Sequence, residues 1–302
     1  MTKQQTLKDS FVLKSKGLHT GLYITATFCP AEVNYGYKIQ RMDLEGQPII
    51  DCDARIVGDT QRGTVLVMGD IKISTIEHAM AALLAAGVDN CLIQLDGPEM
   101  PILDGSSFYF TQFIQKTGLV EQDAEREYIV IDKKIEVEGN NGEHLVIEPA
   151  DEFSLEATIA FDSPNLSNQH TSLASLNDFA ENFASARTFV FVRDIEPLLN
   201  MGLIKGGDLD NAIVIYEREM PQERFDKLAD TLGIPHMDAH HLGYLNHKPL
   251  TWPNECARHK LLDIIGDLAL VGKPIKGKVT AFKPGHTINN KFARAILNEM
   301  KG

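Results

Sequence analysis

One stretch near the C-terminal end decides the fold: Arg258-His259-Lys260-Leu261-Leu262-Asp263-Ile264-Ile265-Gly266-Asp267. Residues four apart are neighbours on a helix, so His259, Asp263 and Asp267 form one polar stripe. The leucines and isoleucines between them give this helix a buried apolar surround. A neutral imidazole beside a carboxylate supplies two ligands of a zinc site. The alternative is an ordinary His–Asp hydrogen bond in the protein interior.

A second segment offers the missing ligand. Ser74-Thr75-Ile76-Glu77-His78 predicts the start of a helix that ends before Gly87. If the two segments meet, His78 completes a metal site and Glu77 becomes a general base beside it, as in metalloproteases where a glutamate adjoins a histidine ligand. Ser74-x-x-Glu77 is also a capping box, which explains Glu77 without any metal. The HExxH motif is absent because position 82 is alanine, so the ligands must come from distant segments.

The composition indicates a soluble, unexported protein. Of its 302 residues, 43% are apolar, which suffices for a substantial core. The longest uncharged apolar stretch is about half a membrane span, and the N-terminus does not resemble a signal peptide. Four scattered cysteines fit a reducing compartment. We therefore expect a cytoplasmic protein with no transmembrane segment. The net charge of −13 argues against nucleic-acid binding, although Lys260, Lys283 and Arg187 could make one site locally positive.

The order of the patterns predicts an α+β protein with two similar domains. Residues 1–122 and 128–302 each read as strands followed by helix, strand and helix, and the acidic segment 120–127 reads as a linker. The expected strands lie near residues 22–28, 35–39, 65–68, 71–73, 91–95, 129–131, 135–137, 145–147, 153–161, 212–216 and 278–282. The expected helices lie near residues 75–86, 107–117, 177–184, 221–232 and 288–300 and around His259. Each domain would be a sheet packed against helices, with the active site between the domains.

Three further histidine segments have two interpretations each. His286 follows a strand and a Pro-Gly turn, and His19 lies between glycines, so each is a loop histidine that is either catalytic or simply exposed. The segment 236–241, His-Met-Asp-Ala-His-His, is denser in ligand-type side chains than any other. It lies in a long stretch with proline and glycine on both sides, where clustered histidines are more often solvated or interfacial than bound to metal.

Six motifs occur in order and together resemble UDP-3-O-acyl-N-acetylglucosamine deacetylase, the zinc amidase of lipid A synthesis. The motifs are Gly17-Leu18-His19-Thr20-Gly21, Ser74-Thr75-Ile76-Glu77-His78, Pro101-Ile102-Leu103-Asp104-Gly105-Ser106, Ala186-Arg187-Thr188-Phe189, the His259–Asp267 stretch and Gly285-His286-Thr287-Ile288-Asn289-Asn290-Lys291. The resemblance covers nearly the whole chain. It implies two α+β domains with one catalytic Zn²⁺ between them, and hydrolysis of the N-acetyl group of the acylated UDP-sugar with release of acetate.

The resemblance also assigns roles near the metal. His78, His259 and Asp263 match the zinc ligands, with an open position for water and the acetamide carbonyl. Glu77 matches the general base that activates this water. His286 matches the protonated histidine that stabilises the oxyanion and donates a proton to the departing amine, and Asp267 matches its partner. Thr188 and Lys260 match residues that stabilise the tetrahedral intermediate or position the substrate.

The same resemblance suggests the substrate contacts. Phe161, Phe189 and Lys283 would contact the nucleotide-sugar. Leu18 and Gly207 would lie near an apolar passage for the acyl chain. Because some lineages fuse this enzyme to a hydroxyacyl-carrier-protein dehydratase, we expect such a domain, fused or associated, in the natural context.

Two departures from the family pattern stand out. The stretch 217–254 is longer than expected, and the segment 62–64 lacks a cysteine that some members carry near the metal. Two other functions stay open: a non-catalytic module in which zinc or a His–Asp pair clamps two halves around a sugar nucleotide, and a zinc amidohydrolase for another N-acyl sugar.

Overall fold

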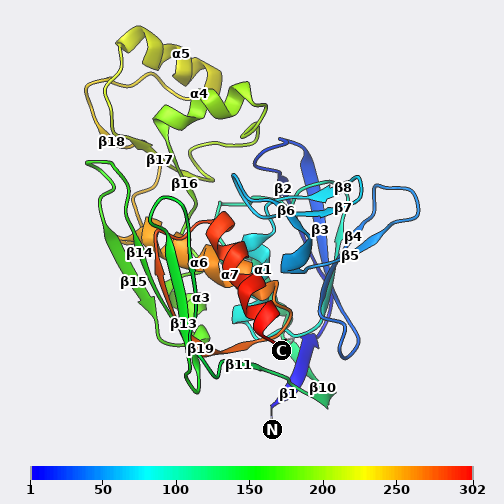
Figure 1. Ribbon diagram of the computed structural model, residues 1–302. Coiled ribbons are helices and arrows are strands. Elements are labelled where there is room, and N and C mark those ends of the chain that lie inside the picture. Colours follow the sequence, from blue (N-terminus) through cyan, green and yellow to red (C-terminus); the bar gives the residue numbers. More distant parts are fainter. Residues whose placement is uncertain (1, 301–302) are drawn as a thin grey trace.

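Two β-sheets enclose a layer of helices in the computed structural model, which describes residues 2–300 (Figure 1). The first sheet has the order β2-β3-β9-β4-β5. Its strands are β2 Phe11–Lys16, β3 Tyr23–Pro30, β9 Cys91–Leu95, β4 Tyr37–Arg41 and β5 Ile49–Asp51. Every second residue of β3 faces the helices, as its alternating pattern predicts: Ile24, Ala26 and Phe28 are buried.

The second sheet repeats the topology of the first. Its order is β12-β13-β19-β14-β15, with the short β11 beside β19. The strands are β11 Ile129–Val130, β12 Ile135–Glu138, β13 His144–Glu148, β14 Phe153–Ile159, β15 Gln169–Leu173 and β19 Ile275–Phe282. In each sheet a late strand, β9 or β19, inserts between two hairpins and runs parallel to the first strand of the second hairpin. The prediction of an α+β fold built from two similar units is confirmed.

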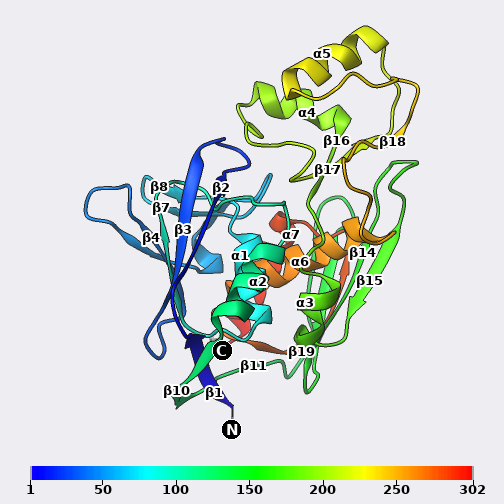
Figure 2. The ribbon, with the colours of Figure 1, turned by 180° about the vertical axis from the view of Figure 1, so that it is seen from behind.

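The helices between the sheets come in matching pairs. Helices α1 Glu77–Ala85 and α2 Phe108–Thr117 flank β9 in the chain, as α6 Glu255–Ala269 and α7 His286–Glu299 flank β19. Helix α1 packs against α6, and α6 against α7 (Figure 2). A methyl group added at Gly266 of α6 would lie 2.1 Å from the backbone oxygen of Glu77, so glycine permits this approach. The remaining short helices of the layer are η1 Ala54–Ile56, η2 Leu176–Asp178 and α3 Phe179–Asn182.

Two smaller three-stranded sheets extend the units. Strands β6 Val57–Asp59, β7 Val65–Met68 and β8 Ile71–Ile73 form one, and the β7–β8 hairpin turns at Gly69 with φ +59°. Strands β16 Phe189–Phe191, β17 Ile213–Tyr216 and β18 Gly243–Tyr244 form the other. With α4 Val192–Asn200 and α5 Gln222–Leu232, they build a lobe that projects beyond the two main sheets and has its own apolar core (Figure 1).

The linker prediction is wrong. Strand β10 Leu119–Glu125 occupies most of the acidic segment and pairs antiparallel with β1 Lys3–Leu7. One main apolar core runs through both sheets and the helix layer, so the two units are packed on each other. The boundaries at residues 122 and 128 stay a prediction. Within residues 2–300, no helix combines the length and the apolar composition needed to cross a membrane.

Candidate metal centre and the pockets beside it

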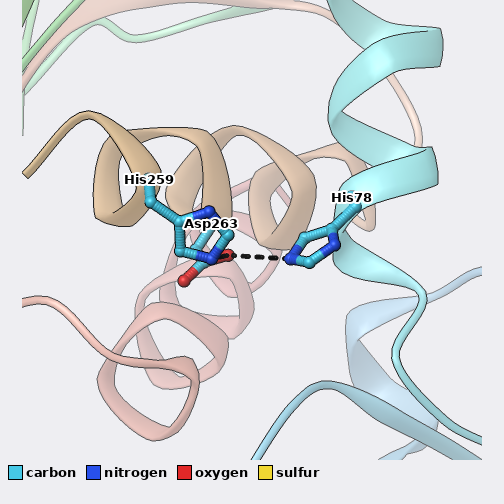
Figure 3. Close-up of side chains that lie close together, drawn as sticks. All are labelled: His78, His259 and Asp263. Atoms are coloured by element: carbon cyan, nitrogen blue, oxygen red, sulfur yellow. Dashed lines mark ion pairs between the residues drawn. The ribbon is translucent and has the colours of Figure 1, made fainter. Parts of the chain in front are cut away.

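Three buried side chains converge where α1 meets α6. His78 comes from α1, and His259 and Asp263 come from α6 (Figure 3). Their ligand atoms lie within 4.8 Å of one another, and within residues 2–300 they are the sole group of histidine, cysteine and acidic side chains with this geometry. Nε2 of His78 lies 3.8 Å and Nε2 of His259 3.3 Å from Oδ1 of Asp263. The two distant segments therefore meet as the sequence suggested.

The protonation of these groups fits a metal site. Nδ1 of His259 donates to the carbonyl oxygen of Ala186 at 2.9 Å, which leaves Nε2 without a proton and directed at Asp263. Burial, with the neighbouring His259, lowers the pKa of His78 to about 3, and burial also lowers the pKa of His259. Burial alone would raise the pKa of Asp263, but the surrounding imidazoles and Lys260 outweigh it and lower that pKa.

One oxygen of Asp263 supports the same conclusion. Oδ1 of Asp263 is buried and has no hydrogen-bond partner. Leaving a buried carboxylate oxygen unpaired is costly, and two unprotonated imidazole nitrogens beside it cannot donate to it. A cation would satisfy all three groups. Two neutral imidazoles and one carboxylate are a donor set that suits zinc and leaves further coordination positions open.

Glu77 turns towards this centre, so the capping-box interpretation is wrong. The helix begins at Glu77 itself, and the Ser74 amide donates to the carbonyl oxygen of Pro98 at 3.0 Å. Burial raises the pKa of Glu77, nearby His286 opposes this, and the carboxylates of Asp263 and Asp267 add to it. The pKa of Glu77 therefore rises to about 7, in the range where a general base works well near neutral pH.

His286 faces Glu77 across the centre. It is the first residue of α7, whereas the sequence predicted a loop. Its Nδ1 lies 3.0 Å from Oδ2 of Asp267, and its Nε2 lies 3.8 Å from Oε1 of Glu77 and 3.8 Å from Oδ2 of Asp263. Burial by itself lowers the pKa of His286, but these three carboxylates outweigh burial and raise the pKa to about 9. The imidazole is thus protonated near neutral pH and can donate a proton.

Thr64 connects the base and the acid, and sequence reasoning missed it. Its amide donates to Oε2 of Glu77 at 3.0 Å, and its hydroxyl donates to Asp267 and lies 3.2 Å from Nδ1 of His286. The residue is 1% exposed. The one available signal was that the segment 62–64 aligns with a near-metal position of the family.

A pocket of about 450 Å³ opens beside the centre, and we call it the polar pocket because charged side chains line it among apolar ones. Its lining includes Phe161, Lys260, Lys283 and His286, so these four predicted site residues are brought together. The amine of Lys260 donates to Oδ2 of Asp263 at 2.8 Å. Burial alone lowers the pKa of Lys260, but Asp263 and other carboxylates outweigh it and raise the pKa. The pocket therefore presents three cations, Lys260, Lys283 and protonated His286, in a protein of strongly negative net charge, although Glu143 also lines it.

An apolar pocket of about 110 Å³ lies between the lobe and the first unit. Its lining includes Leu18, Thr188, Phe189 and Gly207 together with Val190, Ile195, Leu198, Ile204 and Val214. The structure thus brings Thr188 and the two predicted acyl-passage residues to one cavity. Phe189 lines this apolar pocket, and its ring centre lies 5.5 Å from that of Phe161 in the polar pocket, so the two pockets adjoin.

The other histidine segments lie apart from the metal ligands. His19 lines the apolar pocket, and its amide donates to buried Glu99 at 2.8 Å. In the dense segment 236–241, Nε2 of His236 lies 2.7 Å from Asp230, and Nδ1 of His240 lies 3.3 Å from Glu219. Both side chains are largely exposed, at 53% and 79%. This exposure agrees with the interpretation of the segment as solvated or interfacial, and its role stays a prediction.

Two histidines and a carboxylate, with a second carboxylate and a cationic histidine beside them, form the arrangement that metal-dependent hydrolases use. A sequence model of the UDP-3-O-acyl N-acetylglycosamine deacetylase family matches residues 4–229 and 237–298, which include every residue of the candidate site. The chain belongs to this family. The unmatched residues 230–236 fall within the stretch that the sequence marked as unusually long.

Named relatives agree with this assignment. The chain is 60% identical over 302 residues to the bifunctional enzyme LpxC/FabZ of Bacteroides thetaiotaomicron, covering 100% of this chain and 66% of that protein. It is 57% identical to the corresponding protein of Porphyromonas gingivalis, covering 100% and 65%. It is 40% identical over 299 residues to the UDP-3-O-acyl-N-acetylglucosamine deacetylase of Anaeromyxobacter sp., covering 97% and 88%. The chain spans about two thirds of the length of the bifunctional relatives.

Proposed function

We propose that this chain hydrolyses the N-acetyl group of UDP-3-O-acyl-N-acetylglucosamine and releases acetate, an early step of lipid A biosynthesis, with one Zn²⁺ as cofactor. The observation that carries the proposal is the buried cluster of His78, His259 and Asp263, whose unpartnered carboxylate oxygen a cation would satisfy. Glu77 and His286 lie beside it, with Nε2 of His286 3.8 Å from Oε1 of Glu77. Membership of the family supports the substrate.

The residues around the ligands would divide the work of amide hydrolysis. Zinc bound in such a site supplies Lewis acidity for the carbonyl and lowers the pKa of a coordinated water. Glu77 accepts a proton from the attacking water. His286 stabilises negative charge on the former carbonyl oxygen and donates a proton to the leaving amine nitrogen, which is otherwise a poor leaving group. Asp267 holds Nδ1 of His286, so that Nε2 faces the reacting atoms.

The two pockets suggest how the substrate lies. We assign Phe161 and Lys283 to the nucleotide-sugar, because they line the polar pocket. Phe189 would contact the sugar at the junction of the pockets. Leu18 and Gly207 would accompany the acyl chain in the apolar pocket. Lys260 lines the polar pocket and Thr188 lines the apolar pocket, and we assign them to the oxyanion or to substrate positioning.

Zinc content and turnover of the acylated UDP-sugar test the proposal together. Glu77→Gln should keep its zinc and lose about a hundredfold or more in kcat, because it removes only the proton acceptor. Asp263→Ala should lose the metal. Glu156→Gln, which changes a half-exposed carboxylate on β14 that pairs with Lys278, is the matched control and should change neither quantity.

Each alternative function has its own outcome. Normal turnover by Glu77→Gln would refute the assignment of Glu77 as the general base. Full zinc content in Asp263→Ala would refute the assignment of Asp263 as a zinc ligand. Efficient hydrolysis of unacylated UDP-N-acetylglucosamine would favour an amidohydrolase for another N-acyl sugar. Zinc binding with no turnover of either substrate would favour the non-catalytic module.

We also propose that residues 1–122 and 128–302 are the two structural units of the enzyme, and that a hydroxyacyl-carrier-protein dehydratase is fused to it or associates with it. The repeated sheet topology supports the first point. The longer bifunctional relatives support the second. Separate expression of residues 1–122 tests the boundary, and copurification from the native source tests the partner.

A further inference from the structure

Glu99 is a buried carboxylate that takes no part in the chemistry proposed above. It lies shortly after the end of β9 and is 0% exposed. Within residues 2–300, no lysine, arginine or histidine side chain forms an ion pair with it. A carboxylate in the interior is costly unless hydrogen bonds or an opposite charge compensate for the lost water. Glu99 therefore depends on its hydrogen bonds alone.

Four hydrogen bonds converge on the two oxygens of Glu99. Oε1 accepts from the backbone amide of His19 at 2.8 Å and from the hydroxyl of Thr75 at 3.1 Å. Oε2 accepts from the backbone amide of Thr20 at 2.9 Å and from its hydroxyl at 2.7 Å. Each oxygen thus faces one backbone amide, which can only donate. This position therefore requires an acceptor at both oxygens, as a carboxylate supplies.

On one side, Glu99 holds the loop 17–21, which forms part of the wall of the apolar pocket. Leu18 of this loop lines the pocket. A methyl group added at Gly17 would lie 2.3 Å from Oε2 of Glu99, so glycine at this position admits the carboxylate. The lobe contacts the same loop, because the amide of Gly206 donates to the Leu18 carbonyl at 3.0 Å. Glu99 thus anchors a pocket wall from within the fold.

On the other side, Glu99 holds the turn that leads into α1. Thr75 in this turn has φ +58°, a conformation that a β-branched residue adopts only where its surroundings impose it. Its hydroxyl bonds to Glu99, and Ser74 forms a parallel β-bridge with the backbone of Glu99. Helix α1 begins two residues after Thr75, at Glu77. The direction of the turn therefore decides where the carboxylate of Glu77 lies.

We propose that Glu99 is a positioning residue that fixes the wall of the apolar pocket and the general base relative to each other. Movement of the loop 17–21 displaces Leu18, and movement of the turn at Thr75 displaces Glu77. Because one side chain holds both segments, it links the binding of the acyl chain to the placement of the base. The expected effect on turnover rests on the proposed function, whereas the hydrogen bonds that hold the loop do not.

Glu99→Gln tests this role and keeps the shape of the side chain. Whichever way the new amide group turns, its NH2 faces the backbone amide of His19 or that of Thr20. We expect KM for the acylated UDP-sugar to rise about tenfold and kcat to fall about tenfold, because a buried donor is left unpaired. Hydrogen exchange at these two amides should become about tenfold faster, and this measurement needs no substrate.

Two threonine variants separate the two sides of Glu99, since valine keeps the shape of threonine and lacks the hydroxyl. Thr20→Val should raise KM about fivefold and leave kcat nearly unchanged, because it loosens the pocket wall. Thr75→Val should lower kcat about fivefold and leave KM nearly unchanged, because it loosens the turn before the base. Thr20→Ser and Thr75→Ser keep the hydroxyl and should behave like the wild type.

Asp89→Asn is the matched control. Asp89 lies just beyond the opposite end of α1, where its largely buried carboxylate accepts from the amide of Gln5 at 2.7 Å and pairs with Arg126. This variant should lower Tm and leave KM, kcat and exchange at the His19 and Thr20 amides unchanged.

The outcomes separate a positioning role from a structural one. If Glu99→Gln lowers Tm as Asp89→Asn does, but keeps KM and kcat while folded, the positioning role is refuted. If Glu99→Gln does not fold, the threonine variants decide, and equal effects of both on the same constant would refute the link. Absence of turnover by the wild type would refute the proposed function instead. In that case, unchanged exchange at the two amides in Glu99→Gln would still overturn the anchoring of the loop, and faster exchange would support it.

Discussion

Gly266→Ala should separate α1 and α6, the two helices that bring the candidate metal ligands together. The added methyl group would lie 2.1 Å from the carbonyl oxygen of Glu77, 2.8 Å from its carbonyl carbon and 3.0 Å from its Cα. All three are backbone atoms of α1, so no side-chain rotation relieves the clash. One of the helices has to move by about 1 Å to restore an ordinary contact distance.

The expected loss of stability is a difference between two effects. Overpacking in a close-packed interior costs about 3 kcal/mol when the backbone has to shift. Alanine in place of glycine within a helix stabilises the helix by about 1 kcal/mol, because alanine has the higher helix propensity. The free energy of unfolding should therefore fall by about 2 kcal/mol, which lowers Tm by roughly 3 °C in a chain of this size.

The effect on the proposed activity should be larger than the effect on stability. Glu77 and His78 are the first residues of α1, and a displacement of about 1 Å at a catalytic group can lower the rate about a hundredfold. We expect kcat to fall by about this factor at a temperature where the variant is still folded. Thermal unfolding followed by circular dichroism and turnover of the acylated UDP-sugar measure the two effects.

Gly285→Ala is the matched control for stability. Gly285 has φ −169°, which any residue adopts, and an added methyl group meets nothing within 4 Å. Its Tm should stay close to that of the wild type. If Gly266→Ala unfolds at or above the wild-type temperature and keeps full turnover, the close approach of α1 and α6 does not set the geometry of the centre.

Three further substitutions test other parts of the structure. Thr64→Val should lower kcat about tenfold or more and leave the zinc content unchanged, because the lost hydroxyl holds Asp267. Thr64→Ser should restore kcat. Loss of zinc from Thr64→Val would contradict this explanation. Glu255→Ala should cost about 3–5 kcal/mol of unfolding free energy in urea, because the guanidinium of Arg187 stays buried without its partner; a loss below about 1 kcal/mol would refute it. Leu198→Asp should raise KM for the acylated substrate and leave zinc in place; an unchanged KM would remove the acyl chain from this pocket.

Local patterns predict the secondary structure of this chain well where one interaction dominates. Strands β3 and β9 alternate strictly because each has one face on the helices and the other nearer solvent. Helix α2 ends where Gly118 adopts φ +79°. By contrast, β10 reads as a linker because it is an acidic strand in a two-stranded sheet and buries little apolar surface. Its partner β1 lies more than a hundred residues earlier, so no local pattern records the pairing.

The capping box shows why a correct motif can mislead. The spacing of Ser74 and Glu77 suits a capped helix, but Thr75 has φ +58°, and this turn leaves Ser74 outside the helix. Glu77 is then free to turn into the centre. Only the path of the backbone decides between the two interpretations, and that path depends on the contacts of Ser74 with the segment around Pro98.

The site itself was predictable only through residues that carry distinctive chemistry. The spacing of His259 and Asp263, four residues apart, identifies them as neighbours on one face of a helix. Glu77 and His78 stand out because a possible base directly precedes a possible ligand. Thr64 carries no such mark, because a threonine in a short strand-bordering segment is ordinary. Its importance arises from three contacts made across the fold, to Glu77, Asp267 and His286.

The repeated topology explains why a single centre forms between two similar units. Helices α1 and α6 occupy equivalent places before β9 and β19, so a duplicated unit brings the two helices face to face. Glycine at position 266 lets them approach to backbone contact, which places His78 beside the polar stripe of α6. Only α6 carries that stripe, because α1 has alanine or leucine at most of its remaining positions. The fold therefore supplies a symmetric interface, and the unequal sequences of its two helices make one candidate metal site of that interface.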